Sequence, residues 1–204
     1  MENKMKKIMF AIILMLSNIQ AYAGPILSSF TSPAVFFSQS HTLGYAFSSD
    51  SNASVSALGF WDSSLDGFAS SHRVGLWNGV GALLGQVSLS AGTGNTLIND
   101  FRYASLNAAV NLNAGETYYL AGTTANDAWV YQASNIVMDT GINYLGSYFV
   151  SNTFDFPANF ASDRQYMTVN AIISDVPEPS ALLLLTFALA GVVFSRKRKL
   201  IRRN

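Results

Sequence analysis

The stretch "SVSALGFWDSSLDGFASSHRVGLWNGVGALLGQVSL", residues 54–89, contains the sequence pattern on which the predicted fold rests. Short runs of apolar, β-branched and aromatic residues are separated by clusters of Ser, Asp, Asn and Gly. Such alternation of apolar runs and turn residues predicts β-strands at 54–60, 72–77 and 83–89. In the first run we expect Val55, Ala57 and Gly59 to face one way, and Leu58 and Phe60 the other.

The same pattern continues on both sides of this stretch. It predicts further strands at 43–48, 101–106, 116–122, 128–132 and 166–173. The segment 154–164 is expected to be a long loop with exposed aromatic residues or a short helix. Regular strand spacing without a helical period favours an all-β protein, with an antiparallel, jelly-roll-like β-sandwich over residues 24–175. That length corresponds to one domain.

The N-terminus has the layout of a secretory signal peptide. Lys4, Lys6 and Lys7 precede the apolar run "IMFAIILML", and the small-residue sequence "AYAG" follows. This order predicts a signal peptide over residues 1–23 with cleavage after Ala23. The expected partners of this step are the Sec translocon and signal peptidase.

The C-terminus carries a second apolar run followed by a basic tail. Residues 181–195 are apolar and, as a helix, would be ~22 Å long, against about 30 Å for a membrane core. We expect a transmembrane helix here that is short for a permanent anchor. The tail should stay cytoplasmic, because positive charge does so; its first four cations are Arg196, Lys197, Arg198 and Lys199.

The residues before this helix resemble a known sorting signal. Val176, Pro177, Glu178, Pro179 and Ser180, followed by the short apolar run and the basic tail, resemble the PEP-CTERM signal at residues 176–204. The resemblance implies processing by an exosortase in a Gram-negative bacterium. It also implies transient insertion in the inner membrane, removal of the tail, and delivery to the cell surface or outside the cell. An ordinary permanent anchor is the alternative.

The central stretch resembles a second family. Its matching residues are Asp62, Asp66, Gly67, Ser71, His72, Val74, Gly75, Leu76 and Trp77. Over about residues 40–122 the chain is similar to a β-sandwich module found in secreted bacterial proteins with this sorting tail. The resemblance implies the fold. It implies no activity, because the module has no settled function.

Charge and cysteine content exclude several classes of protein. Residues 24–175 contain ten acidic and three basic residues, which gives a net charge of −7. Nucleic-acid binding needs clustered cations, so no nucleic-acid partner is expected. The chain has no cysteine, which excludes zinc–thiolate sites and cysteine nucleophiles. No cofactor is expected.

The segment "DSSLDG" resembles the beginning of a calcium-binding loop. Asp62, Ser64 and Asp66 have the spacing of the first ligands of such a loop. Position twelve should be a bidentate Glu, but Arg73 stands there, and a cation repels calcium. The preferred interpretation is a solvated turn without metal. A looser calcium site at Asp62 and Asp66 is the alternative.

Candidate catalytic groups are few. A triad of Ser71, His72 and Asp66 could be assembled, but no nucleophile elbow or oxyanion-hole loop accompanies it. Asp62 and Asp66 could serve glycoside cleavage only at a separation that sequence does not give. We therefore expect a protein that is not an enzyme. A sugar-active secreted enzyme is the alternative.

Aromatic residues give the best indication of binding. Trp61 and Trp129 flank polar turns, so they are expected to be exposed and to stack on sugar faces. Trp77 is expected in the core, because strand aromatics are mostly packing residues. The sequence thus predicts an exported protein with a structural or adhesive role in an exopolysaccharide layer or biofilm. A permanently anchored periplasmic glycan-binding module is a further alternative.

Overall fold

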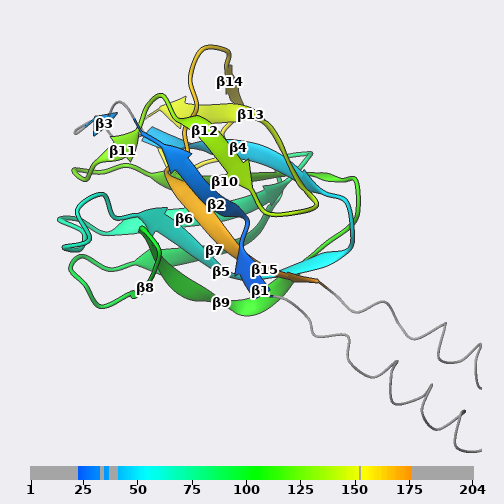
Figure 1. Cartoon of the computed structure of the whole chain (residues 1–204), viewed down its shortest axis with the longest axis horizontal. Helices are drawn as coiled ribbons and strands as arrows, with labels where there is room; N and C mark the ends of the chain where they lie inside the picture. The colour runs from blue at the N-terminus through cyan, green and yellow to red at the C-terminus, as the bar shows by residue number, and fades with distance from the viewer. Residues whose placement is uncertain (1–22, 33–34, 37–40, 152, 176–204) are drawn as a thin grey trace, which may run out of the picture. The chain divides into compact units, whose positions relative to one another are not determined.

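The computed structural model describes residues 23–32, 35–36, 41–151 and 153–175 (Figure 1). The predicted signal peptide up to residue 22, the sorting motif, the helix at 181–195 and the basic tail lie outside the described residues. Within the described part of the chain, no helix has the length and apolar character needed to cross a membrane.

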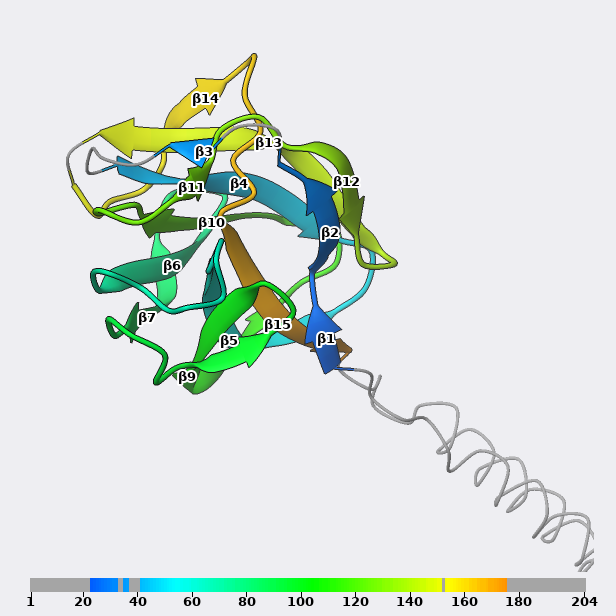
Figure 2. The ribbon, with the colours of Figure 1, turned by 60° about the vertical axis from the view of Figure 1, so that its left-hand side comes forward.

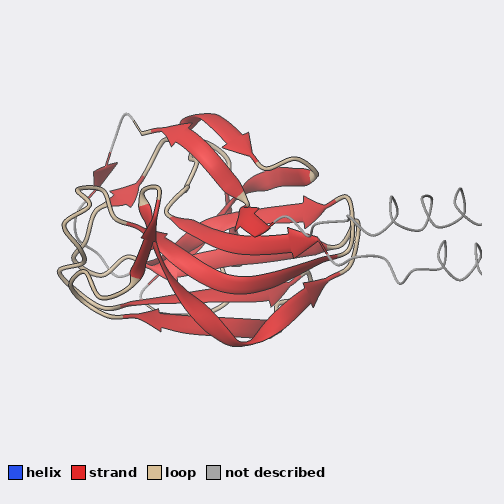
Figure 3. Cartoon of the chain, turned by 60° about the horizontal axis from the view of Figure 1, so that its bottom comes forward, coloured by secondary structure: helices blue, strands red, loops and turns tan. Residues whose placement is uncertain are grey.

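The described residues form strands joined by turns and loops (Figure 3). In chain order, the strands are β1 (Ala23–Pro25), β2 (Leu27–Thr31), β3 (Val35–Phe36), β4 (His41–Ser49), β5 (Ala53–Trp61), β6 (His72–Asn78), β7 (Leu83–Leu89), β8 (Thr96–Ile98), β9 (Phe101–Leu112), β10 (Thr117–Thr123), β11 (Trp129–Val130), β12 (Ser134–Met138), β13 (Ile142–Ser151), β14 (Asn159–Ala161) and β15 (Val169–Asp175).

Two antiparallel sheets make up most of the domain. One has the order β1-β15-β5-β9-β8 and the other the order β14-β13-β4-β10-β6-β7. In Figure 2 the larger sheet runs from β14 and β13 at the top to β7 at the lower left, and β5, β9, β15 and β1 lie below. Two short pairs, β11 with β3 and β12 with β2, complete the described strands. The expectation of an all-β, antiparallel fold is confirmed, whereas the jelly-roll-like order stays a prediction.

One hydrophobic core lies between the two sheets. The larger sheet contributes Tyr45, Phe47, Leu76 and Leu120, and the smaller sheet contributes Val55, Leu58, Phe60 and Tyr103. Each of these side chains is at most 4% exposed. Burying one Leu, Val or Phe side chain contributes about 1.5–3 kcal/mol, so this core is the main source of stability in a chain that has no disulfide.

A β-bulge changes the predicted alternation in β5. The pairing of β5 with β9 shifts register between Val55 and Ala57. Val55, Leu58 and Phe60 are therefore all fully buried in the core. The prediction that Val55 and Leu58 face opposite ways is wrong, because the extra residue of a bulge reverses the alternation that follows it.

The segment 154–164 covers part of the outer face of the larger sheet. It contains β14 and no helix, so the alternative of a short helix is wrong. Phe154 packs on Trp77 with ring centroids 5.4 Å apart, and Phe156 packs on Tyr119 at 4.9 Å. Phe154 and Phe156 are half-buried, and only Phe160 is as exposed as expected, at 58%. Trp77 is buried, as expected, although it lies beneath Phe154 on the outer face of the sheet.

The first and last described strands lie side by side (Figures 1 and 2). Ala23 of β1 pairs with Ser174 of β15, and Asp175 pairs with Ala53 at the start of β5. At the other end of the same pairing, Val169 lies opposite Phe60. The seven residues of β15 span ~20 Å between these two ends. The chain thus leaves the described domain at the end of the sheet that is opposite to Phe60.

Candidate functional site: a pocket between two loops

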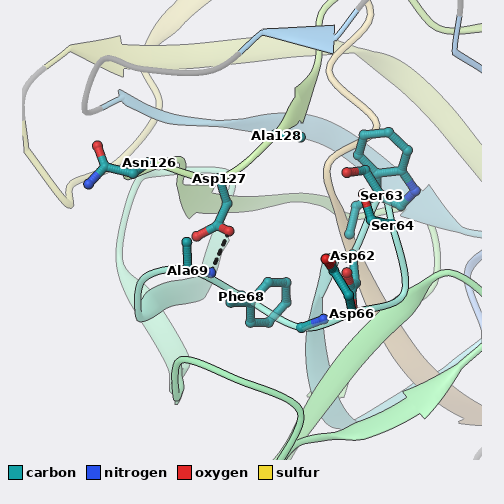
Figure 4. Close-up of a pocket in the computed structure, with 11 residues that line it drawn as sticks. Asp62, Ser63, Ser64, Asp66, Phe68, Ala69, Asn126, Asp127 and Ala128 are labelled. Atoms are coloured by element: carbon teal, nitrogen blue, oxygen red, sulfur yellow. Dashed lines mark hydrogen bonds between the residues drawn. The ribbon is translucent and has the colours of Figure 1, made fainter.

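A pocket of about 220 Å³ lies beyond Phe60, at the end of the domain that is opposite to Asp175. Two loops form it: residues 62–71, which join β5 to β6, and residues 124–128, which join β10 to β11 (Figure 4). Its lining consists of Trp61, residues 62–64 and 66–69 of the first loop, and residues 126–128 of the second. The fold thus brings together segments that are about 60 positions apart in the sequence.

A buried ion pair holds the first loop. Oδ2 of Asp62 accepts hydrogen bonds from Nε of Arg102, at 2.6 Å, and from the backbone N–H of Gly67, at 3.0 Å. Asp62 and Arg102 are 3% and 4% exposed. A pair withdrawn from water this far is stable only if its remaining donors are also satisfied.

Arg102 satisfies this condition by binding three further backbone carbonyls. One terminal nitrogen donates to the carbonyls of Thr93, at 3.0 Å, and Asn95, at 3.1 Å. The other donates to the carbonyl of Leu65, at 3.3 Å. The guanidinium therefore joins the loop after β5 to the loop before β8, and only its planar, multidentate shape allows this.

Asp127 holds the other half of the first loop. Its Oδ1 accepts from the N–H of Ala69, at 2.7 Å, and its Oδ2 accepts from the N–H of Ser70, at 2.9 Å (Figure 4 shows the contact with Ala69). Nε2 of His72 lies 3.0 Å from the same Oδ2. One carboxylate of the second loop thus anchors the last part of the first loop and lies beside His72 at the start of β6.

His72 is fully buried beside this carboxylate. Its ring stacks on Phe60 with centroids 4.0 Å apart and meets Phe68 edge-on. Nδ1 lies 2.6 Å from the carbonyl oxygen of Thr123 and must carry a proton there, because a carbonyl only accepts. Burial lowers the pKa of His72 from its ordinary 6.5, although the carbonyl of Thr123 and the carboxylate of Asp127 oppose this shift.

The direction of this shift predicts a loss of stability in acid. Because the pKa of His72 is lower in the folded than in the unfolded chain, the unfolded chain binds more protons below about pH 6.5. The contribution of His72 to the free energy of unfolding should therefore be present above this pH and decrease as the pH falls towards the folded pKa. Titration of the imidazole C2 proton by NMR should place the pKa of His72 below that of an unfolded peptide.

The matched control is His72→Gln. Denaturant unfolding of this variant should depend less on pH than unfolding of the parent in the same range, because the carboxylates are common to both. A pKa of His72 at or above 6.5 would show that its pairing with Asp127 outweighs burial.

Two non-glycine residues in these loops adopt left-handed backbone conformations. Leu65 has φ = 61° and Ala125 has φ = 46°. Such a conformation costs roughly 1–2 kcal/mol per residue for an L-amino acid. The ion pair and the Asp127 contacts hold the two loops in place despite this cost.

Several polar side chains in the pocket remain available to a ligand. Asp66, Asn126, Ser63 and Ser64 are exposed and line the pocket. Asp62 and Asp127 also line it, but their carboxylates already accept the hydrogen bonds described above. The chemistry that this arrangement supports is hydrogen bonding to a small polar molecule.

The structure separates the two tryptophans that were predicted to stack on sugars. Trp61 lines the pocket and is half-buried, with its ring 5.9 Å from that of Phe30. Trp129 is only 6% exposed and packs with Leu43 and Tyr166 in a second, smaller core. The expectation that Trp129 is exposed is wrong, because β11 packs its ring against that core.

The predicted acidic and catalytic groups are also placed differently from the sequence alternatives. Asp62 and Asp66 line one pocket, but Asp62 is neutralised by Arg102, which disfavours the alternative of a calcium site. Among the described residues there is no group of three or more His, Asp or Glu side chains arranged to hold a metal. His72 contacts Asp127 rather than Asp66, so the triad considered from the sequence is not assembled around Asp66.

Sequence reasoning missed Arg102, Asn126 and Asp127. Arg102 lies 40 positions from Asp62, and Asp127 lies 55 positions from His72. A local pattern does not connect residues so far apart. An indirect signal was present, because residues 24–175 contain only three cations and Arg102 lies inside a predicted strand, where an arginine needs a partner.

A second pocket, of about 300 Å³, lies towards the other end of the domain. Its lining includes Asn78, Asn111, Asn113 and Glu116. Asn78 holds the turn between β6 and β7, since its Oδ1 accepts from the N–H groups of Val80 and Ala82. None of the residues predicted from sequence to form a site lies there.

Comparison with known families agrees with this fold and with the sorting signal. Residues 31–168 match the family model described as a domain of unknown function, DUF4082, and residues 175–199 match the PEP-CTERM protein-sorting motif. Because the first match covers more than half of the chain, the protein belongs to the DUF4082 family. The second match identifies it as an exported, exosortase-processed protein. A search of curated proteins found no match.

Proposed function

We propose that the protein is a non-enzymatic, structural or adhesive component of an extracellular polysaccharide layer or biofilm. The sorting motif supports this, because exosortase processing delivers a protein to the cell surface or outside the cell. On this proposal, the signal peptide is removed after Ala23. The C-terminal helix holds the chain transiently in the inner membrane before the tail is removed.

The placement of the pocket is the observation that carries the proposal. The chain continues into the sorting motif directly after Asp175, and Asp175 pairs with Ala53. Trp61, at the other end of β5, lines the pocket. Its backbone N–H donates to the carbonyl of Thr168 at 2.9 Å. A ligand can therefore reach the pocket from the end of the sheet that is opposite to Asp175, the last described residue.

The use of the acid and base groups favours binding over catalysis. The carboxylate of Asp62 is held by Arg102, and that of Asp127 accepts from two backbone N–H groups. A general acid or base must exchange protons with a substrate. In this pocket the best-placed groups instead hold the loops in one conformation, as a binding site requires.

Fractionation of the producing cells tests the proposal. The processed protein should stay with the washed extracellular polysaccharide and appear in the medium only after that polysaccharide is digested. The measurement is the amount of protein in each fraction by quantitative immunoblot. A secreted protein that lacks affinity for the polysaccharide, passed through the same washes, serves as the control.

Two results would contradict the proposal. Recovery of the processed protein in the medium without digestion would show that it is not a component of the matrix. Release of new reducing ends from the isolated polysaccharide by the purified protein would instead support the sugar-active enzyme.

A further inference from the structure

We infer that the pocket between the two loops binds a single sugar residue of a neutral polysaccharide, with Asp66 as its main hydrogen-bonding group. This inference rests on the proposed function and specifies its ligand. It differs from the sequence expectation, which assigned binding to exposed Trp61 and Trp129 without a pocket.

The first reason is that the pocket is held rigid before a ligand arrives. Five positions of the first loop are tied: the carbonyl of Leu65 to Arg102, the N–H of Gly67 to Asp62, Phe68 to Gly92, and the N–H groups of Ala69 and Ser70 to Asp127. The bonds between Phe68 and Gly92 run both ways, at 3.3 and 2.7 Å. A preformed site loses little conformational entropy when it binds, so a weak ligand gains affinity.

The second reason is the set of polar groups that the structure leaves available. No described residue donates a hydrogen bond to the carboxylate of Asp66, in contrast to Asp62 and Asp127 in the same pocket. Asp66 thus offers two acceptor oxygens, and the exposed hydroxyls of Ser63 and Ser64, in the same loop, can donate and accept. Neighbouring sugar hydroxyls, each both a donor and an acceptor, match this combination.

The third reason is the charge of the pocket. Its lining contains Asp62, Asp66 and Asp127 but no lysine or arginine. The charge of Arg102 is taken up behind the lining by Asp62 and the backbone carbonyls of the loops. Acidic sugars such as uronic acids would meet the carboxylate of Asp66 without a compensating cation, so the pocket should select neutral sugars.

The fourth reason is size and shape. At about 220 Å³, the pocket is smaller than the ~300–1,000 Å³ that is usual for drug-sized ligands, which fits one sugar ring better than a long oligosaccharide. Trp61 supplies an apolar wall on which the face of a sugar ring can lie. Binding at one such pocket is weak, and retention in a matrix would depend on many copies along a polymer.

Affinity electrophoresis of the full chain in detergent tests the inference. The probe is the producer's own extracellular polysaccharide, separated by anion exchange into neutral and acidic fractions and cast into the gel. The parent should be retarded by the neutral fraction and not by the acidic one. Asp66→Asn should weaken this retardation about tenfold, because it replaces a charged hydrogen-bond acceptor by a neutral one.

The matched control is Asp163→Asn, which makes the same change of charge on a side chain that is 76% exposed and outside the pocket. Its retardation should equal that of the parent. Equal retardation of Asp66→Asn and the parent, or preference for the acidic fraction, would overturn the pocket assignment and leave the proposed function standing. No retardation of the parent by either fraction would overturn both.

Discussion

Replacing Arg102 by alanine is expected to lower the free energy of unfolding by about 3–5 kcal/mol, which is the usual cost of breaking a buried ion pair from one side. The carboxylate of Asp62 would remain 3% exposed with only the N–H of Gly67 as a partner. The carbonyls of Leu65, Thr93 and Asn95 would lose a charged donor at the same time. Thermal unfolding should show Tm lowered by roughly 10 °C.

Arg73→Ala is the matched control for this variant. Arg73 is exposed, donates to Gln86 and lies 3.9 Å above the ring of Phe154. Such a surface contact contributes only about 0.5–1 kcal/mol. If Arg102→Ala loses no more stability than Arg73→Ala, the ion pair does not hold the loops. The pocket would then lack the rigidity on which the sugar-binding inference depends.

Replacing Pro177, Glu178 and Pro179 by alanine is expected to abolish removal of the C-terminal tail. Each proline fixes its own φ and keeps the preceding residue extended, and a protease binds its substrate in an extended form. The three changes lie beyond Asp175, the last residue of β15, so the folded domain should be unaffected. The intact mass of the product should correspond to a chain that keeps its C-terminus, and this chain should stay in the membrane fraction.

Ser162→Ala combined with Asp163→Ala is the control, because both residues are exposed and lie outside the motif. This variant should be processed like the parent. Unchanged mass and location of the Pro-Glu-Pro variant would contradict sorting through this motif. A parent chain that itself keeps the tail would instead indicate the permanently anchored module.

The strands that were predicted best are those with a strong local pattern. The predicted strand 83–89 has the bounds of β7, and the predictions at 54–60 and 72–77 each differ from β5 and β6 by one residue at one or both ends. Each of these runs ends at a cluster of Gly, Asn, Asp or Ser, which fixes its limits. The type and place of an element can be read wherever the signal lies within the element itself.

The strands that were missed depend on their partners. β13 (Ile142–Ser151) is interrupted by Gly146 and Ser147, yet it pairs with β4 along its length through a bulge between Tyr144 and Gly146. The β-strand at 128–132 was predicted too long, since β11 covers only Trp129–Val130. In both cases pairing and packing with distant segments outweigh the local preference.

In the candidate site, too, the local sequence indicated some of the residues, whereas distant residues determine their roles. Asp62, Asp66 and Trp61 could be singled out from the sequence because they lie next to one another in a turn after a strand. Their roles could not, because the partner that neutralises Asp62 comes from β9, and the opposite wall of the pocket comes from the loop after β10. Long-range contacts therefore decide which carboxylate supports the loop and which is available to a ligand.

The amino-acid sequence was sufficient to predict an all-β domain and the sorting signal. Both are encoded by neighbouring residues within short segments. The pocket exists only in the folded chain, where Asp127 ties two loops that are about 60 residues apart and Arg102 holds the first of them. Tertiary packing also decided that Trp129 is buried, and to which side of the sheet the residues of β5 after Val55 point. The physical reason is that burial and charge pairing are properties of the assembled sheets, and a residue's own neighbours along the chain do not specify them.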